Sequence, residues 1–537
     1  MDPFGCALAV SLAVTFAGGA PPVGDRPVET VMQDDALMLH GSERRVRDVA
    51  REMDSLGVDR VRITASWFLL APGRESTERP QFDAADPAAY AEWRWDHLDR
   101  AVKAVVSTGM KPMLDVAFFA PRWAVERGAR DGDHRWRPSV PEFGQFAEAV
   151  ARRYDGGYED PEEEGSKLPA VRLWTTWNEP NHASFLLPQW ERRPGRRRRW
   201  RPESPHIYRG MHEAGYAAIK KVNDRNRVLL GGTSFLGSPR PGPRRNVAPL
   251  RFLRELACVD RRLRPLRRPE CRGFSPLRAD GYAHHPYSFY SGPSEPDPNP
   301  DNVRIADLPR LGSTLAQLLE RERIAQSLPI YVTEYGYETN PPDTVRGVTL
   351  EQQASFMSEA TYLAWRNPEV RMFAQFLLRD IGPVESEPEG SPQRWRDYQT
   401  GLRTHDGRPK PALNAFRLPF WVERAVTDDG TEGLAAFGQV RPGSGPRQLT
   451  IEVLAPDGNW VATPSLPVRN TAPDQDCASF ASDPQGFFSR FIRLRGGDHT
   501  LRAVWQRLDA PPVISQPVTV TSDRPAGRLS SLVRPEA

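Results

Sequence analysis

Two glutamates, Glu179 and Glu334, each stand directly after a short apolar run that is typical of a buried strand. Glu179 lies in the stretch Trp-Asn-Glu-Pro-Asn at 177–181, and the proline after it prevents the strand from continuing. Glu334 follows the run at 329–333. Two carboxyl groups about 5–5.5 Å apart can cleave a glycosidic bond with retention, because one protonates the leaving group while the other attacks the sugar carbon.

The rest of the chain must bring these two residues together. From residue 28, short apolar runs alternate with longer amphipathic segments, a pattern that predicts repeated strand–helix units and a parallel sheet. The run before Glu179 is the fourth of these and the run before Glu334 the seventh. We therefore predict an α/β fold in which a (β/α)8 TIM barrel spans residues 23–420 and carries both glutamates at one rim.

A second, smaller domain is expected after the barrel. Beyond residue 421, strand-like runs such as 449–454, 491–494 and 501–505 are separated by turns. We predict a small β-sandwich accessory domain over 421–537 that ends in a disordered tail. The 537 residues, of which 39% are hydrophobic, suffice for two cores, and the net charge of +3 says little about partners.

The two glutamate motifs resemble those of clan A glycoside hydrolases, most closely family 39 and relatives near family 5. The likeness covers roughly residues 28–420 and implies that Glu179 is the acid/base and Glu334 the nucleophile. It also implies that Asn178 contacts the sugar 2-hydroxyl. The string His285-Pro286-Tyr287 is similar to the clan's sixth-strand motif, in which the tyrosine keeps the nucleophile ionised. The expected partner is a carbohydrate, an oligo- or polysaccharide, and no cofactor is expected.

Arg62 is a candidate for supporting the nucleophile. It lies inside the second apolar run, where a buried arginine is costly unless a carboxylate pairs with it. The resembling enzymes carry a strand-two arginine near their nucleophile. The alternative is an arginine that faces solvent.

Four further residues could contact a sugar. Trp67 and Trp123 could stack on pyranose faces, or could simply pack in the protein. Asn181 follows the acid/base. Gln375 stands in the region where the resembling enzymes usually have a tryptophan beneath the cleaved sugar. This departure leaves the subsite floor and the identity of the sugar open.

The N-terminal segment and the cysteines of the chain indicate export. Residues 1–22 read as a signal peptide without its basic leader, or as a disordered tail, and we expect a secreted or cell-surface protein with no membrane span in the mature chain. Cys258 and Cys271 bracket a short loop and could form a disulfide, or could stay unpaired, and Cys477 is left over. The cysteine and histidine spacings predict no metal site.

Arginine clusters suggest a charged substrate. The runs 192–200 and 240–245 follow the fourth and fifth strands and would rim the barrel mouth, which favours an anionic glycan. Alternatively, these arginines fill solvated loops. A different class of function, a non-catalytic glycan- or polyanion-binding protein on a barrel scaffold, stays open, although we expect no nucleic acid partner.

Overall fold

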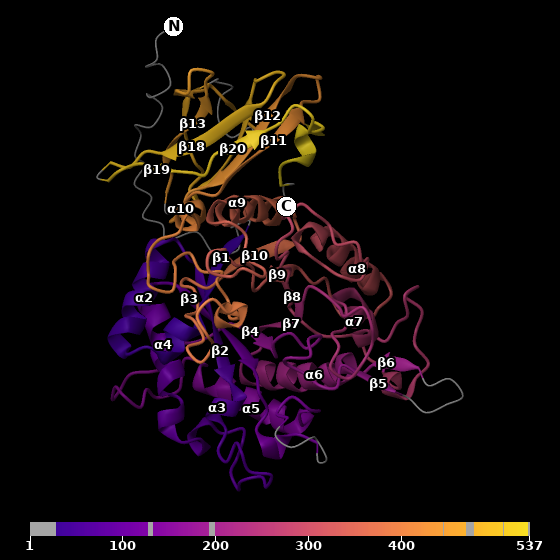
Figure 1. The fold of residues 1–537 in the computed structure, drawn as a ribbon. Helices are drawn as coiled ribbons and strands as arrows, with labels where there is room; N and C mark the ends of the chain where they lie inside the picture. The colour runs from indigo at the N-terminus through magenta and orange to yellow at the C-terminus, as the bar shows by residue number, and fades with distance from the viewer. Residues whose placement is uncertain are drawn as a thin grey trace.

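The computed structural model describes residues 28–126, 133–192, 199–443, 445–468, 477–508 and 510–534. Two parts are stacked on one another, a barrel surrounded by helices and a smaller body made of strands (Figure 1). The expected signal segment, residues 1–22, and most of the first arginine cluster lie outside the described residues.

The larger part is a closed barrel of eight parallel strands, as predicted. Neighbouring strands follow the order β1, β2, β3, β4, β7, β8, β9 and β10, and β10 pairs with β1 to close the circle. The strands are β1 (Glu29–Gln33), β2 (Arg60–Ser66), β3 (Lys111–Ala117), β4 (Leu173–Thr176), β7 (Arg227–Ser234), β8 (Gly281–His285), β9 (Ile330–Val332) and β10 (Val370–Phe376).

Helices surround the barrel (Figure 1). They are α1 (Asp35–His40), α2 (Glu43–Ser55), α3 (Trp67–Leu70), α4 (Asp96–Ser107), α5 (Val140–Arg153), α6 (Ser204–Val222), α7 (Pro249–Leu256), α8 (Leu308–Glu320), α9 (Leu350–Arg366) and α10 (Pro411–Arg417). Their sequences explain where they begin: Ser42 caps α2 by accepting a hydrogen bond from the Arg45 amide, and Thr349 with Gln352 forms a capping box at α9. A small hairpin, β5 (Trp190–Arg192) and β6 (Trp200–Pro202), lies outside the barrel.

The barrel interior changes from apolar to polar along the strands. Its apolar layer contains Val31, Met113, Leu173, Leu229, Ala283, Tyr331, Met372 and Ala374. Since side chains two residues apart point to the same face of a strand, the next inward positions are Gln33, Asp115, Thr175 and His285. The apolar layer fills the barrel, and the polar layer above it forms the floor of a site.

The smaller part is a β-sandwich. One sheet contains β15 (Leu466–Pro467), β17 (Phe487–Ile492), β12 (Glu432–Gln439), β11 (Phe420–Val426) and β21 (Gly527–Arg528). The other contains β14 (Trp460–Ala462), β13 (Gln448–Leu454), β18 (His499–Trp505) and β19 (Val513–Ile514), with β16 (Ser479–Ala481) on β13 and β20 (Val518–Val520) on β18.

The end of the chain packs against the barrel. The Tyr362 hydroxyl of α9 donates to the Leu532 carbonyl at 3.0 Å, and the Arg534 guanidinium donates to four carbonyls between Trp365 and Val370. The described residues 510–534 are therefore ordered and do not belong to the predicted disordered tail. Buried apolar surface and satisfied carbonyls hold this segment in place.

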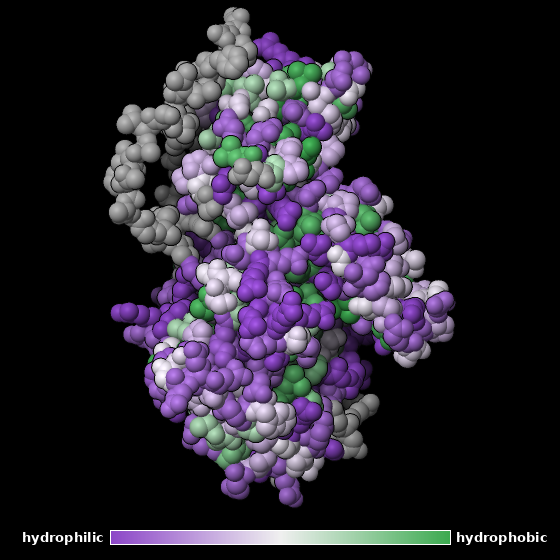
Figure 2. All heavy atoms as spheres, turned by 90° about the vertical axis from the view of Figure 1, so that its left-hand side faces the viewer, coloured by the Kyte–Doolittle hydropathy of each residue, from purple (hydrophilic) through white to green (hydrophobic). Residues whose placement is uncertain are grey.

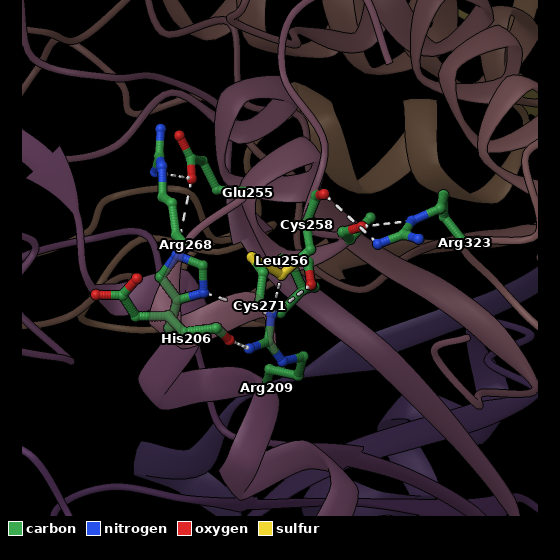
Figure 3. The surroundings of a disulfide bond; sticks show 10 residues. His206, Arg209, Glu255, Leu256, Cys258, Arg268, Cys271 and Arg323 are labelled. Carbon is green, nitrogen blue, oxygen red and sulfur yellow. Dashed lines mark hydrogen bonds and ion pairs between the residues drawn. A yellow bond between two sulfur atoms is a disulfide. The ribbon is translucent and has the colours of Figure 1, made fainter. Parts of the chain in front are cut away.

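Cys258 and Cys271 form a disulfide that closes the loop between α7 and β8 (Figure 3). From α6, Arg209 donates to the Leu256 carbonyl at 3.1 Å, to Cys258 Sγ at 3.0 Å and to the Glu270 carbonyl. Cys477 is also disulfide-bonded, so the expectation that it is left over is wrong.

The face of the molecule in Figure 2 is mostly hydrophilic over both parts, with hydrophobic side chains scattered across it. Within the described residues, no helix has both the length and the apolar character needed to cross a bilayer.

Candidate active site

Glu179 is held in an unusual backbone conformation three residues beyond β4. Its φ is 39° and that of Trp177 is 73°, both in the left-handed region that side-chain-bearing residues rarely adopt. The Glu179 amide donates to the Gly232 carbonyl at 2.9 Å, which fixes this turn to the end of β7. The surrounding structure therefore supports local strain in order to hold the carboxyl group at the barrel mouth.

Glu334 lies two residues beyond β9 and has two strong donors. Arg62 Nη1 donates to Glu334 Oε1 at 2.6 Å, and the Tyr287 hydroxyl donates to Oε2 at 3.1 Å. Both donors favour the ionised carboxylate. Arg62 is 1% exposed, so it is a buried arginine paired with carboxylates and does not face solvent.

Arg62 organises the floor of the site. Besides Glu334, it donates to Asp115 Oδ2 at 2.8 Å, to Asn178 Oδ1 at 3.0 Å and to Gln33. Asp115 also accepts from the Thr175 hydroxyl at 2.6 Å. This network ties the ends of β1 to β4 and β9 into one arrangement. Because Asn178 Oδ1 accepts from Arg62, its amino group is left to donate to a ligand.

The two glutamates and His285 form one cluster. Their ligand atoms all lie within 4.8 Å of one another. The His285 ring nitrogen Nδ1 is 2.9 Å from Glu179 Oε1 and 3.6 Å from Glu334 Oε2. Three such groups could bind a cation, but the Arg62 guanidinium already neutralises Glu334, and a second positive charge beside it is disfavoured.

Burial dominates the protonation of this cluster. It raises the pKa of Glu179, and the hydrogen bond from His285 opposes this rise only in part. Burial also raises the pKa of Glu334, against the lowering effects of Arg62 and Tyr287. The pKa of His285 is lowered to about 4 by burial, so the ring is neutral at pH 7 and its Nδ1–H donates to Glu179. Glu179 thus has a neutral partner and Glu334 a cationic one, which favours the protonated form at Glu179 and the ionised form at Glu334.

A cavity of about 630 Å³ lies over the two glutamates. Asn178, Tyr287 and Thr64 also line it. Its aromatic walls are Phe118, Phe185, Phe235, Tyr287, Phe289, Phe376 and Tyr398. The volume is typical of a small-molecule site, and apolar walls with a few converging polar groups suit a sugar ring.

The two candidate tryptophans pack in the protein, the alternative that the sequence left open. Trp67 is the first residue of α3 and packs on Phe143 and Phe146 of α5, while the Trp123 indole donates to the Pro72 carbonyl at 3.0 Å. Neither tryptophan lines the cavity.

Two predicted polar contacts are structural instead. The Asn181 amide bonds the backbones of Ser234 and Val247, and the Gln375 amide donates to the carbonyls of Phe376, Leu377 and Thr400. Both side chains are buried, and their hydrogen-bonding groups are used to fix loops.

Other cavity residues were not predicted. These are Asp35, His182, Glu338 and Arg346, together with most of the aromatic wall. Asp35 could have been found, because it follows the end of the first strand, where barrels place functional groups. The loop residues Glu338 and Arg346 do not directly follow a strand, so the sequence does not indicate that they line the cavity. They pair at 3.4 Å, and burial raises the pKa of Glu338 to about 8.

The second arginine loop does not line the cavity. Arg244 pairs with Asp133 at 2.7 Å, and Arg244 and Arg245 border a separate hollow. Among the described residues, the arginine that lines the cavity is Arg346.

No protein-family model matches the sequence, and none of the curated proteins matches it. Among solved structures, a glucosidase from Croceicoccus marinus shares 14% identity, with 84% of this chain and 92% of that chain covered and a TM-score of 0.44. An endo-β-1,4-mannanase from Thermotoga petrophila shares 12%, with 93% and 99% covered and a TM-score of 0.39. A β-glycosidase from the hyperthermophile Thermosphaera aggregans shares 16%, with 73% and 95% covered and a TM-score of 0.42. The closed strand order of this chain establishes its barrel independently of these likenesses.

Proposed function

We propose that this protein is a retaining glycoside hydrolase that cleaves O-glycosidic bonds of an oligo- or polysaccharide. The observation that carries the proposal is the meeting of Glu179 and Glu334 in one cavity, with carboxylate oxygens within 4.8 Å of each other. This separation suits direct attack by a carboxylate. An inverting enzyme needs roughly 6.5–9.5 Å between its carboxyl groups to admit a water molecule.

In the first step Glu334, as the carboxylate, attacks the anomeric carbon while Glu179 donates its proton to the leaving oxygen. The bond to the leaving group breaks and an ester forms between the sugar and Glu334. Arg62 and Tyr287 hold the attacking carboxylate ionised and oriented.

In the second step Glu179, now ionised, accepts a proton from water, and that water attacks the anomeric carbon. The ester bond breaks, and Glu334 leaves as a carboxylate. The two inversions give net retention. His285 donates to Glu179, which stabilises the ionised form of Glu179 needed at this stage.

Two finer points belong to this proposal. Among the described residues, Arg346 is the arginine that supports an anionic glycan, since Arg244 and Arg245 border a different hollow. An extracytoplasmic location is supported by the disulfides of Cys258, Cys271 and Cys477, because such bonds persist in oxidising compartments.

The test is the pair of substitutions Glu334→Ala and Glu179→Ala, assayed on aryl glycosides with good and with poor leaving groups. We expect Glu334→Ala to show no measurable turnover on either and Glu179→Ala to lose about 100- to 10,000-fold in kcat/KM on the poor leaving group. Azide should rescue Glu334→Ala with an inverted glycosyl azide and Glu179→Ala with a retained one.

Glu351→Ala, on the exposed first turn of α9, is the matched control and should keep full activity. Full activity in either active-site variant would remove the assignment. Sugar binding without cleavage by the wild-type protein would instead favour a non-catalytic glycan-binding protein.

A further inference from the structure

Asp35 is a fixed carboxylate at the mouth of the barrel that the double displacement does not use. It follows β1 by two residues and lines the same cavity as Glu179 and Glu334. Thr64 donates to it twice, from its amide to Oδ1 at 3.2 Å and from its hydroxyl to Oδ2 at 2.6 Å. Gln33 Nε2 donates to Oδ2 at 3.0 Å.

These bonds leave capacity for a ligand. A carboxylate has about four lone-pair positions, two on each oxygen. Oδ2 has both positions filled by the protein, whereas Oδ1 accepts only from the Thr64 amide among the described residues. One acceptor position of Asp35 is therefore open, on a side chain whose orientation is already fixed. A preorganised acceptor of this kind loses little freedom when a hydroxyl binds to it.

The order of the strands in the barrel indicates which part of a substrate Asp35 would contact. In the closed barrel β1 lies two strands from β9 and three from β4, on the far side of the mouth from the β4–β7 edge (Figure 1). Glu179, at that edge, must face the leaving oxygen in order to protonate it. The sugar ring that is transferred to Glu334 therefore extends from Glu179 toward β1.

We propose that Asp35 is a specificity-determining residue that accepts a hydrogen bond from a hydroxyl of the transferred sugar, remote from the scissile bond. This inference rests on the proposed glycosidase function and adds the ligand chemistry at one position. A substrate without that hydroxyl leaves this half-buried carboxylate acceptor unsatisfied in the complex and reacts more slowly.

The test uses kinetic coupling between the protein and the substrate. A panel of 4-nitrophenyl α- and β-glycosides of glucose, galactose, mannose and xylose identifies the best substrate of the wild-type protein. Its 3-, 4- and 6-deoxy derivatives are then assayed with the wild type and with Asp35→Asn. Asp48→Asn, the same change on the exposed face of α2, serves as the control and should match the wild type.

We expect Asp35→Asn to lower kcat/KM for the parent glycoside by roughly 10- to 100-fold, the effect of one charge-assisted hydrogen bond. For one deoxy derivative the two proteins should differ by less than about threefold, because the hydrogen bond is already missing in the wild type. That derivative identifies the bound hydroxyl.

If Asp35→Asn lowered kcat/KM equally for the parent glycoside and for every deoxy derivative, Asp35 would act only on the fold. If the variant showed no loss of kcat/KM on the parent glycoside, Asp35 would have no role in binding. Either result overturns the inference while cleavage by the wild type leaves the proposed function standing. If the wild type hydrolyses none of the panel, the proposed function is contradicted and this inference with it.

Discussion

Glu179 and Glu334 have different hydrogen-bond partners, and this difference supports the roles proposed for them. Both carboxyl groups are buried, which raises both pKa values. Glu334 is compensated by the guanidinium of Arg62 and the hydroxyl of Tyr287, whereas Glu179 has the neutral ring of His285. A charge partner lowers a carboxyl pKa more than a neutral donor does. Glu334 is thus the carboxyl group that ionises first, which supports its proposed role as the nucleophile.

The pH profile tests this difference through Tyr287→Phe. Catalysis needs Glu334 ionised, so activity rises with pH through the pKa of Glu334 and falls once Glu179 loses its proton. The substitution removes a hydrogen bond to the ionised form and therefore raises the pKa of Glu334. We expect the acidic limb of the kcat/KM profile to move to higher pH, with a roughly 10-fold lower plateau.

Tyr335→Phe is the matched control. Its ring stacks on Tyr287 at 6.2 Å between centroids, but its hydroxyl donates to the Tyr337 hydroxyl and, within the part of the chain that the structure describes, to no carboxylate. Its acidic limb should stay in place. A Tyr287→Phe profile with an unmoved acidic limb would contradict the assignment of Glu334 as the ionised nucleophile.

At the scale of elements, the ends of the barrel strands position the two glutamates, and the loops supply other residues that line the cavity. The alternation of short apolar runs with longer amphipathic segments predicted the barrel, and the two glutamates were predicted because each directly follows such a run. The sequence left open whether Trp67 packs or contacts a sugar, and it packs because the chain turns into α3 at that residue, which directs the indole to α5. The sequence could not show that Asn181 and Gln375 support loops, because their partners include carbonyls that are distant in sequence.

The loop between α7 and β8 offers a separate test of an element. The disulfide of Cys258 and Cys271 closes 13 residues, and cross-linking a loop of that size stabilises a protein by about 2–4 kcal/mol. We expect the double variant Cys258→Ser with Cys271→Ser to lower the free energy of unfolding in denaturant by that amount. Since neither residue lines the cavity, kcat/KM should be unchanged.

The double variant is preferable to a reducing agent, because reduction would also open the disulfide of Cys477. Single Cys271→Ser is a useful comparison, since it removes the same cross-link. A double variant with unaltered stability would contradict a stabilising role for this cross-link, and a large loss of activity below the melting temperature would tie the loop to the site.

At the scale of the whole molecule, the barrel and the sandwich share apolar packing. Trp365 of α9 lies with its ring centroid 4.4 Å from that of Phe437 on β12, and Arg534 is tied to the end of α9. Among the described residues, those that line the cavity all precede residue 401. The sandwich therefore buries one side of the barrel and contributes no described side chain to the cavity.

Sequence patterns predicted both parts but not how they are joined. The sequence does not show that Trp365 contacts Phe437, because each residue has the pattern of an ordinary core residue of its own domain. The same holds for Asp35, which looks like a second helix-capping acid beside Asp34 until its hydrogen bonds to Thr64 are seen.

The stereochemistry of hydrolysis tests the central claim most directly. Proton NMR of the wild-type reaction, recorded before the product anomers interconvert, shows which anomer is released first. With carboxylates within 4.8 Å of each other, the first product should have the same anomeric configuration as the substrate. Release of the opposite anomer would mean that water attacks the sugar directly, and would contradict Glu334 as the nucleophile.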